Sequence, residues 1–409
     1  MKIRQAQLPK DWEIKTLAEV ASFSQGIQVG LEKHLKEPQE GYVRFIRIVD
    51  YTQNTEDIRY IPNPGDKYFV NEEDIVMVRY GTPGLIGRGK AGVIANNLFR
   101  IKIERKDLTN DYLSLFLSQD HIQRYLSTQG SATMPALNFG QLRTVEVIIP
   151  PLPEQQRIVS LLDRAFAAID QAKANYERCL SLSKVLFESY LQGVFEKKGD
   201  DWEELKLKEI GLTQTGNTPK TSEKENYGDY ISFIKPADVD FSGVGDLRYD
   251  NNGLSEIGFR KARSMKNGST LMVCIGATIG KVGFAEQDVT SNQQINSLTV
   301  SDGYFPKFFY YAMTSRVFQE KVLSAGKGAQ ATLPIINKSK WESLTIAFPK
   351  LKSKQESYSK RFDVLRTETQ KLETIYQKKI DDLEELKKSI LQKAFQGELE
   401  IGVAVESET

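Results

Sequence analysis

Two segments of this chain concentrate positive charge beside small and polar residues. Residues 79–106 hold seven basic side chains and one acidic side chain, Glu104. Residues 257–285 hold five basic side chains and no acidic one. Both segments are rich in glycine, asparagine and threonine, so backbone N–H groups can approach phosphates closely. Either segment alone is typical of a solvated surface, but their recurrence in corresponding halves of the chain favours contact with nucleic acid.

Amide side chains accompany these basic segments. Asn292, Gln293 and Gln294 lie in TSNQQ at 290–294, and Asn96 and Asn97 lie in ANNLFR at 95–100. Asn and Gln can form paired hydrogen bonds with an adenine edge, and Arg or Lys with a guanine edge. The sequence therefore predicts base reading as well as phosphate contact. The candidate DNA-binding residues are Arg47, Arg79, Tyr80, Thr82, Arg88, Lys90, Asn96, Asn97, Thr133, Lys235, Arg263, Thr278, Lys281, Asn292, Gln293, Gln294 and Thr332.

No motif predicts a catalytic centre. His34 and His121 have no companions at the spacing of a zinc site. A Ser-His-Asp or Cys-His arrangement assembled in space stays open, but the second half has no histidine, so a duplicated site of that kind is excluded. GATIGKVG at 276–283 has three residues between its glycines where a phosphate-binding loop needs four, and Val282 stands where Ser or Thr is required. DDWEELK at 200–206 is typical of surface charge. We expect no catalytic residue, metal site or cofactor here.

Composition indicates a soluble protein of several domains. The 409 residues are 40% apolar and 27% charged, with a net charge of +1, and such a length predicts at least two domains. The near-neutral charge argues mildly against a stand-alone nucleic-acid binder. Cys179 and Cys274 form no disulfide framework. With no secretory signal and no apolar run long enough for a membrane span, a cytoplasmic protein is expected.

The chain repeats itself in two halves. Trp12 corresponds to Trp202, FIRIVD at 45–50 to FIKPAD at 233–238, and ATMPALN at 132–138 to ATLPIIN at 331–337. Gln192-Gly193 is matched with Gln396-Gly397. Matches that keep their order while the spacing drifts indicate duplication followed by divergence. Each half therefore predicts one α/β domain with short strands broken by glycine and proline.

A long helix follows each predicted domain. Apolar residues recur in alternating steps of four and three after Glu154 and again after Tyr358, with Ser183 and Lys379 as the exceptions. This period predicts a coiled-coil seam, and each helix is the obvious partner of the other, antiparallel. Packing of each helix only on its own domain is the alternative. The predicted boundaries are 1–150 for the first domain, 151–196 for its helix, 197–349 for the second domain, 350–397 for its helix, and 398–409 for an acidic, disordered tail.

These elements predict a fold class and a way of reading DNA. We expect two similar α/β (α+β) domains, separated by two long antiparallel coiled-coil helices and related by an approximate two-fold axis. Two divergent domains held apart by helices would read two different short DNA words with an unread gap between them, as symmetric dimers read spaced half-sites. The predicted DNA site is bipartite and asymmetric.

The chain resembles the specificity subunit of Type I restriction–modification enzymes. The resemblance rests on the starts at Trp12 and Trp202, TSNQQ at 290–294, the loops at 130–138 and 328–337, PLPEQQRIV at 151–159, and LQGVF at 191–195 with FQGELE at 395–400. It implies two target recognition domains with the helices as a ruler. It also implies two methyltransferase (modification) subunits and restriction/translocase subunits as partners. S-adenosylmethionine, ATP and magnesium would then belong to those partners.

The sequence departs from that pattern in two places. ANNLFR stands where the second half has TSNQQI, and only Asn96 is placed in register with Asn292. PKLKSKQ at 349–355 lacks counterparts of Pro153 and Glu154, so equivalent docking of both methyltransferase subunits is an open question. The alternative function is a coiled-coil scaffold that organises a complex without touching DNA, but it leaves the paired basic, amide-rich loops unexplained.

Overall fold

A computed structural model describes residues 9–53, 56–127, 136–137, 139–239, 247–249, 253–326 and 335–398. The chain divides into two compact units. Unit 1 comprises the residues up to Tyr176 together with those from Lys378 onward, and unit 2 comprises Glu177–Gln377. The predicted acidic tail lies outside the described residues beyond Glu398, as do most of the two repeated phrases at 132–138 and 331–337.

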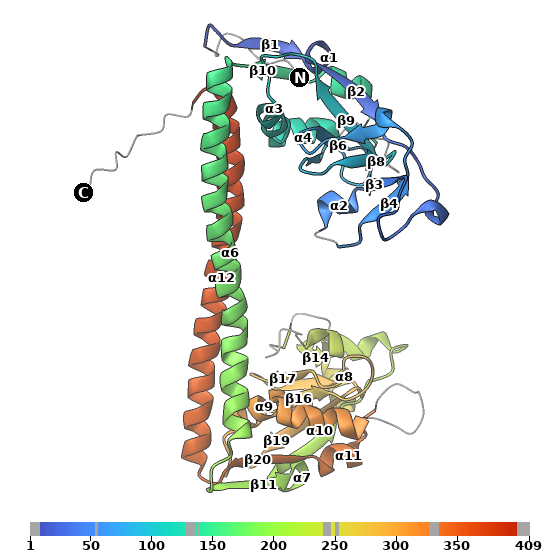
Figure 1. The fold of residues 1–409 in the computed structure, drawn as a ribbon. Helices are drawn as coiled ribbons and strands as arrows, with labels where there is room; N and C mark the ends of the chain where they lie inside the picture. The colour runs from blue at the N-terminus through green and yellow to red at the C-terminus, as the bar shows by residue number, and fades with distance from the viewer. Residues whose placement is uncertain are drawn as a thin grey trace, which may run out of the picture. The chain divides into compact units, whose positions relative to one another are not determined.

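Unit 1 begins with an α/β domain and continues into a long helix, whose residues after Tyr176 belong to unit 2 (Figure 1). Its elements in chain order are β1 (Glu13–Thr16), α1 (Leu17–Val20), β2 (Ala21–Gln25), η2 (Leu31–Lys33), β3 (Tyr42–Ile46), α2 (Val49–Thr52), β4 (Arg59–Pro62), η3 (Asp66–Tyr68), β5 (Phe69–Val70), β6 (Ile75–Val78), β7 (Ile86–Gly87), β8 (Gly92–Ile94), β9 (Leu98–Ile103), α3 (Asn110–Leu117), α4 (Asp120–Ser127), α5 (Phe139–Arg143), β10 (Glu146–Ile149) and α6 (Leu152–Glu196).

Unit 2 repeats this order with small differences, and its last long helix passes into unit 1 at Lys378. Its elements are β11 (Trp202–Lys206), α7 (Leu207–Ile210), β12 (Gly211–Thr215), η4 (Lys224–Asn226), β13 (Tyr227–Ile231), β14 (Phe233–Ile234), η5 (Pro236–Asp238), α8 (Glu256–Lys261), β15 (Ser264–Met265), β16 (Thr270–Val273), β17 (Val282–Phe284), β18 (Val289–Ser291), β19 (Ile295–Val300), α9 (Pro306–Thr314), α10 (Arg316–Gly326), α11 (Lys338–Ser343), β20 (Thr345–Pro349) and α12 (Lys352–Gln396).

Strand order shows that the two units share one topology. A four-stranded sheet runs β2-β9-β6-β7 in unit 1 and β12-β19-β16-β17 in unit 2. A second sheet runs β4-β3-β8-β5 in unit 1 and β14-β18-β15 in unit 2, whose described residues form no strand in the place of β4. In both, the first strand pairs antiparallel with the last, as β1-β10 and β11-β20. The predicted fold class, two similar α/β domains with an internal repeat, is confirmed.

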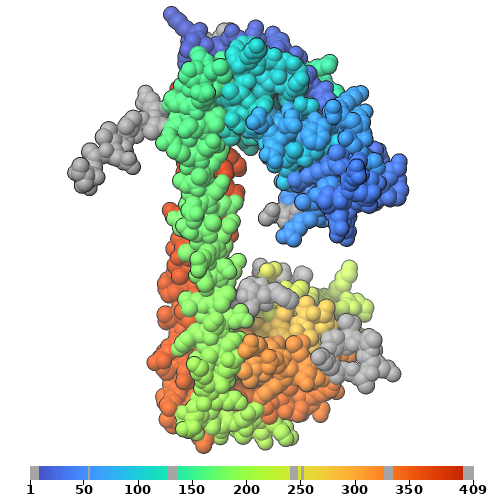
Figure 2. Space-filling view, in the orientation of Figure 1, coloured from blue at the N-terminus to red at the C-terminus, as the bar shows by residue number. Residues whose placement is uncertain are grey.

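The two long helices pair antiparallel within each unit. In unit 1, Asp170 of α6 forms an ion pair with Lys387 of α12, and Lys173 of α6 forms one with Glu384 of α12. Residue numbers rise along one helix as they fall along the other, so the two helices run in opposite directions. In unit 2, the ring of Tyr190 on α6 lies 5.8 Å from that of Phe362 on α12. Figure 2 shows the side chains of the two helices in contact along their lengths. The predicted pairing of the two helices with each other is therefore confirmed. The alternative, in which each helix packs only on its own domain, is wrong.

The predicted seam is wrong at Leu186 in the first helix and at Leu386 in the second. Leu186 is exposed whereas the next residue, Phe187, is buried. Leu386 is exposed, and Ile380 is buried next to the predicted seam position Lys379. A straight α-helix drifts about 20° per heptad against a strict seven-residue repeat. Over helices of 45 residues each, that drift moves the buried face round to the next residue.

Each domain completes its core with residues from both long helices. In unit 1, Trp12 and Phe116 lie in one buried cluster with Leu162 of α6 and Phe395 of α12. In unit 2, Phe308 and Trp341 lie in one buried cluster with Phe195 of α6 and Phe362 of α12. The segments that cover each domain therefore come from parts of the chain far apart in sequence.

These clusters correct one predicted match between the halves. Leu191 and Phe195 are buried near the end of α6, and Leu391 and Phe395 occupy the same places in α12. LQGVF therefore corresponds to LQKAF at 391–395, and the match of Gln192-Gly193 with Gln396-Gly397 is wrong. Burial decides the register because the large aromatic side chain fills the space between helix and domain.

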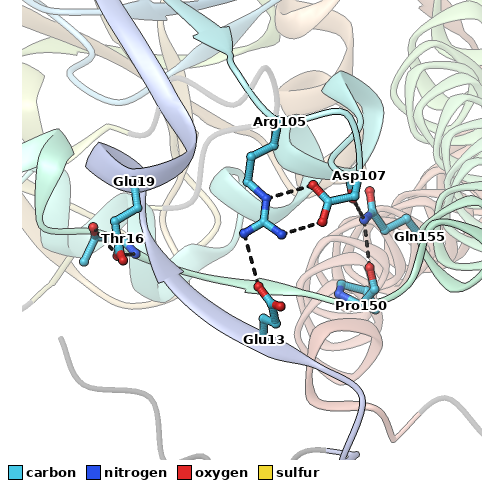
Figure 3. A network of polar contacts seen from close by, with 7 residues as sticks. All are labelled: Glu13, Thr16, Glu19, Arg105, Asp107, Pro150 and Gln155. Carbon is cyan, nitrogen blue, oxygen red and sulfur yellow. Dashed lines mark hydrogen bonds and ion pairs between the residues drawn. The ribbon is translucent and has the colours of Figure 1, made fainter.

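A buried glutamine joins each long helix to its domain. Nε2 of Gln155 donates to the carbonyls of Pro150 and Asp107, at 2.8 and 2.7 Å (Figure 3). Its Oε1 accepts from the backbone N–H of Thr109. Gln355 donates to Pro349 at 2.8 Å and accepts from the backbone of Phe305 at 2.9 Å. Both side chains are fully buried, so these bonds satisfy groups that water does not reach.

An ion network surrounds the first of these glutamines. The Arg105 guanidinium donates to the carboxylates of Asp107 and Glu13 (Figure 3). The hydrogen bonds from Arg105 to Asp107 lower the pKa of the Asp107 carboxyl. Because Glu13 is on β1 and Asp107 precedes α3, the network ties the first strand to the turn that meets α6.

None of the helices in the described part of the chain combines the length and apolar character that a membrane span needs.

Replacing Gln355 by Leu should destabilise unit 2 by about 1–3 kcal/mol, because the backbone N–H of Phe305 would remain buried without an acceptor. Chemical unfolding followed by the fluorescence of buried Trp341 measures this. The control is Gln370→Leu, an exposed position on the same helix, where a change within about 0.5 kcal/mol is expected. Equal effects of the two substitutions would contradict the assigned role of Gln355.

Candidate nucleic-acid interface

Three strand ends meet at one edge of each unit and bring the predicted amide residues together. We call this the polar edge, defined in unit 1 by residues 26–28, 47 and 95–97 and in unit 2 by residues 216–218, 235 and 292–294. In unit 1 the backbone N–H of Ile27 donates to Ile94 at 3.0 Å, and that of Asn96 to Ile27 at 2.8 Å. In unit 2 the backbone N–H of Asn217 donates to Ser291 at 2.9 Å. The backbone thus builds the same frame twice.

The strand register fixes which polar residues are equivalent. Parallel pairing aligns Ile46 with Ile94 in unit 1 and Ile234 with Ser291 in unit 2. A turn follows in each unit, and one backbone hydrogen bond closes it. The N–H of Leu98 donates to the carbonyl of Ala95 in unit 1, and the N–H of Ile295 donates to the carbonyl of Asn292 in unit 2. The residues 95, 96 and 97 therefore correspond to 292, 293 and 294. The predicted register of Asn96 with Asn292 is wrong by one residue, because Asn96 occupies the place of Gln293.

A basic residue directly follows strand β3 in unit 1 and strand β14 in unit 2. The backbone N–H groups of Arg47 and Lys235 donate to Asp50 and Asp238, at 2.7 and 2.8 Å, in the same local turn. Both aspartates are buried. The match of FIRIVD with FIKPAD is thereby confirmed at the level of hydrogen bonds, and it places a cation beside the amides in each unit.

Acidic partners constrain Arg47. Its side chain forms ion pairs with Asp50 and Asp57, each at 3.3 Å. Desolvation raises the pKa of Asp57, but hydrogen bonds and charge from Arg47 and Arg59 outweigh it, and the pKa ends below its ordinary value. Arg47 is therefore held in place at the edge, with its charge partly balanced.

Unit 1 has a hollow at its polar edge. Its volume is about 280 Å³, and Arg47, Asn96 and Asn97 line it together with the apolar side chains of Ile27 and Phe45. Oδ1 of Asn97 is buried and has no hydrogen-bond partner within the described protein atoms. An unpaired buried acceptor beside a cation suits a ligand group that can donate a hydrogen bond.

Arg79 and Tyr80 adjoin this edge. The backbone N–H of Arg79 donates to the carbonyl of Asn97 at 2.8 Å, and its guanidinium lies 4.6 Å from the Tyr80 ring centre. Thr82 is exposed in the next loop. In unit 2, Cys274 occupies the position equivalent to Arg79, because the backbone N–H of Cys274 donates to the carbonyl of Gln294. Burial raises the pKa of the Cys274 thiol to about 12, so it is no nucleophile at neutral pH.

Equivalent glutamine side chains hold the loops after β6 and β16 by the same kind of hydrogen bonds. Nε2 of Gln123 donates to the carbonyls of Gly84 and Leu117, and Nε2 of Gln319 donates to those of Gly280 and Met313. Thr278 lies in the second of these loops. Lys281 follows it and donates from Nζ to the carbonyl of Val239 at 3.2 Å.

The remaining predicted residues lie in other places. Arg88 forms an ion pair with Asp111 of α3, and Lys90 lies 5.8 Å from the ring centre of Tyr51. Arg263 joins the polar edge of unit 2, because its backbone N–H donates to Oδ1 of Asn217 at 2.8 Å and its guanidinium donates to the carbonyl of Thr215. Thr133 and Thr332 lie outside the described residues. Among the described residues, no cluster of His, Cys, Asp and Glu could hold a metal ion.

Comparison with known proteins identifies the duplicated domain. The Type I restriction modification DNA specificity domain matches residues 9–177 and again 199–384. The chain belongs to this family. Its two matches coincide with the two repeats that strand order reveals, and they include the polar edge of each unit.

Relatives and solved structures agree with the family. The EcoBI specificity subunit of Escherichia coli is 24% identical over 87% of this chain and 80% of its own length. The MjaVIII specificity subunit of Methanocaldococcus jannaschii is 25% identical over 61% of this chain, and this match spans 57% of that relative. The HsdS subunit of Thermoanaerobacter tengcongensis shares the fold, with 18% identity, a TM-score of 0.62 and coverage of 96% of this chain and 98% of its own. A chain from a structure of type I R-M complex assembly shares it with 17% identity, a TM-score of 0.75 and coverage of 96% and 99%.

The sequence predictions missed Gln28 and Thr218 on the polar edge of this family member. Asn96 donates to Oε1 of Gln28 at 3.3 Å, and Thr218 donates to Oε1 of Gln293 at 2.6 Å. Gly26 and Gly216 precede the two residues by the same spacing, in SQGIQ at 24–28 and QTGNT at 214–218. That pair of glycines is the signal that could have revealed both positions.

Replacing Gly216 by Ala should disturb the polar edge of unit 2. The added Cβ would lie 2.3 Å from the carbonyl oxygen of Asn292, and overpacking of this kind costs about 1–3 kcal/mol. Tryptophan fluorescence during chemical unfolding measures the cost. Gly303→Ala, where a Cβ has open space, is the matched control. If Gly216→Ala proved as stable as this control, the close backbone contact at the edge would be refuted.

Proposed function

We propose that this protein is the non-catalytic, DNA-reading specificity subunit of a Type I restriction–modification system. One observation carries the proposal: a family of DNA specificity domains matches the chain twice, and each match presents amide and basic side chains on the same three strand ends. Asn and Gln suit adenine edges, and Arg and Lys suit guanine edges and phosphates. Each unit would read one word of a bipartite site in double-stranded DNA.

The two words should differ. Unit 1 offers Asn96 and Asn97 beside Arg47, whereas unit 2 offers Asn292, Gln293 and Gln294 beside Lys235. Arg can make two parallel hydrogen bonds to guanine in a fixed fork, but Lys acts as a point charge. Identical frames with different side chains therefore favour an asymmetric site.

Partners would supply the chemistry and part of the binding energy. We expect two methyltransferase subunits and the restriction/translocase subunits to assemble on this chain in the cytoplasm, with S-adenosylmethionine, ATP and Mg²⁺ bound by those partners. A net charge of +1 agrees with partners that share the phosphate contacts. The name of the E. coli relative, a specificity subunit of a Type I restriction enzyme, supports this assignment.

The starts of the two long helices differ in charge, which bears on how the methyltransferase subunits dock. Glu154 forms an ion pair with Arg157 of its own helix. At the corresponding place in α12, Lys354 forms an ion pair with Asp201. A partner that contacts both helix starts would meet opposite charges there, so we expect the two docking contacts to be unequal.

A scaffold without DNA contact is the competing function. It accounts for the paired helices but not for two polar edges built with the same hydrogen bonds. Methylation mapping of a host genome with and without this protein separates the two: a split recognition sequence that depends on the protein supports DNA reading, and an unchanged methylation pattern supports the scaffold.

Single substitutions should loosen one word at a time. We expect Asn96→Ala to relax base preference only in the word read by unit 1, and the equivalent Gln293→Ala only in the word read by unit 2, by about 1–3 kcal/mol per lost base contact. Binding to duplexes with single base-pair changes measures both. Loss of preference in both words from either substitution would contradict reading by separate domains.

Shortening both long helices should change the gap and leave the words intact. Deleting residues 177–183 of α6 and 374–380 of α12 removes two turns and about 10 Å from each helix, which is roughly three base pairs of duplex. We expect the preferred gap to shorten by about that amount. Binding to duplexes with a graded series of gaps tests this, and an unchanged optimum would refute the ruler role of the helices.

A further inference from the structure

We propose that Thr218 and Gln28 are positioning residues that determine specificity, each by holding a neighbouring amide, Gln293 or Asn96, in one orientation toward DNA. Orientation decides whether an amide offers a hydrogen-bond donor or an acceptor to a base edge. The inference rests on the proposed function and deepens it, because it states what kind of base edge each unit accepts.

In unit 2 a hydroxyl group holds the amide. Oγ1 of Thr218 donates to Oε1 of Gln293 at 2.6 Å, and both side chains are exposed. The hydroxyl occupies the acceptor end of the Gln293 amide, so Nε2 and its two hydrogens are directed away from Thr218. Gln293 is thereby set to donate to a base acceptor, such as N7 or O6 of guanine.

In unit 1 a second amide holds the first one. Nδ2 of Asn96 donates to Oε1 of Gln28 at 3.3 Å. One of the two Nδ2 hydrogens of Asn96 is therefore engaged by Gln28, and Oδ1, at the other end of the amide, is directed away from Gln28. Asn96 is set to accept from a base donor, such as N6 of adenine or N4 of cytosine. The two equivalent amides thus present opposite polarity.

The backbone explains why these two positions can reach the amides. A Cβ on Gly26 would lie 2.1 Å from the carbonyl oxygen of Ile94, and a Cβ on Gly216 would lie 2.3 Å from that of Asn292. Glycine therefore lets the end of β2 or β12 lie directly against the turn that carries the amide. Two residues later, the side chain of Gln28 or Thr218 is beside it.

In unit 2, hydrogen bonds of the residue before Thr218 also fix the position of the Thr218–Gln293 pair. Asn217 accepts the backbone N–H of Arg263 and donates to the carbonyl of Lys261. Because Asn217 immediately precedes Thr218, these bonds fix the backbone from which the hydroxyl extends. Thr218 is held by its neighbours and in turn orients Gln293, whose amide would touch the base.

The test uses the full chain purified with its modification subunits and a pool of randomised DNA duplexes. The unaltered protein first selects its preferred duplex. Discrimination between this duplex and all its single base-pair variants is then measured for two substitutions. Thr218→Val removes the hydroxyl at nearly constant shape, and Thr218→Ser keeps it. Exposed Thr221, three residues further along the same loop, provides the control Thr221→Val. Gln28→Leu tests the other unit.

We expect Thr218→Val to lose about fivefold or more of its discrimination at one base pair of one word, within the range of a single base contact. The salt dependence of binding and the unfolding midpoint should stay unchanged, Thr218→Ser and Thr221→Val should match the unaltered protein, and Gln28→Leu should act on the other word only. Full discrimination by Thr218→Val, uniform weakening on every duplex, or equal loss in Thr218→Ser would overturn the proposal. Absence of any selected sequence with the unaltered protein would overturn the proposed function itself, and this inference with it.

Discussion

Each domain of this protein depends on apolar contacts that its own stretch of chain does not supply. Trp12 and Phe116 are buried only together with Leu162 and Phe395, which belong to two different long helices. Unit 2 has the same requirement, with Phe308 and Trp341 packed on Phe195 and Phe362. Removing such aromatic contacts costs several kcal/mol, so the fold of either domain is tied to the pairing of the helices.

Directional bonds add geometry to this apolar contact. Gln155 and Gln355 accept from the backbone of the turn before α3 or α9 and donate to the end of β10 or β20. Hydrophobic burial alone permits sliding and rotation, because it has no direction. A fully satisfied buried amide permits neither, so the helix start and the domain take one relative position within each unit.

Duplication has preserved the frame and varied what it presents. The hydrogen bonds of Arg47 and Lys235 to buried aspartates, and of the turns at 95–98 and 292–295, are the same in both units. The side chains at the surface differ at nearly every matched position of the polar edge. Backbone bonds are indifferent to side-chain identity, which is why recognition can change while the fold is retained.

The amino-acid sequence by itself determined the duplication, the α/β character of each half, the two long helices and their mutual pairing, because matched phrases and hydrophobic periods are local patterns. It also located the amide and basic segments. It did not determine the register of Asn96 with Gln293, the match of LQGVF with LQKAF, or the buried face late in each helix. Those depend on strand pairing, on which aromatic side chain fills a space, and on accumulated helical drift. The matched glycines could have marked Gln28 and Thr218 as equivalent positions, but not as partners of the amides. Their contacts join residues 68 and 75 apart in sequence, and only the folded sheets bring such strand ends together.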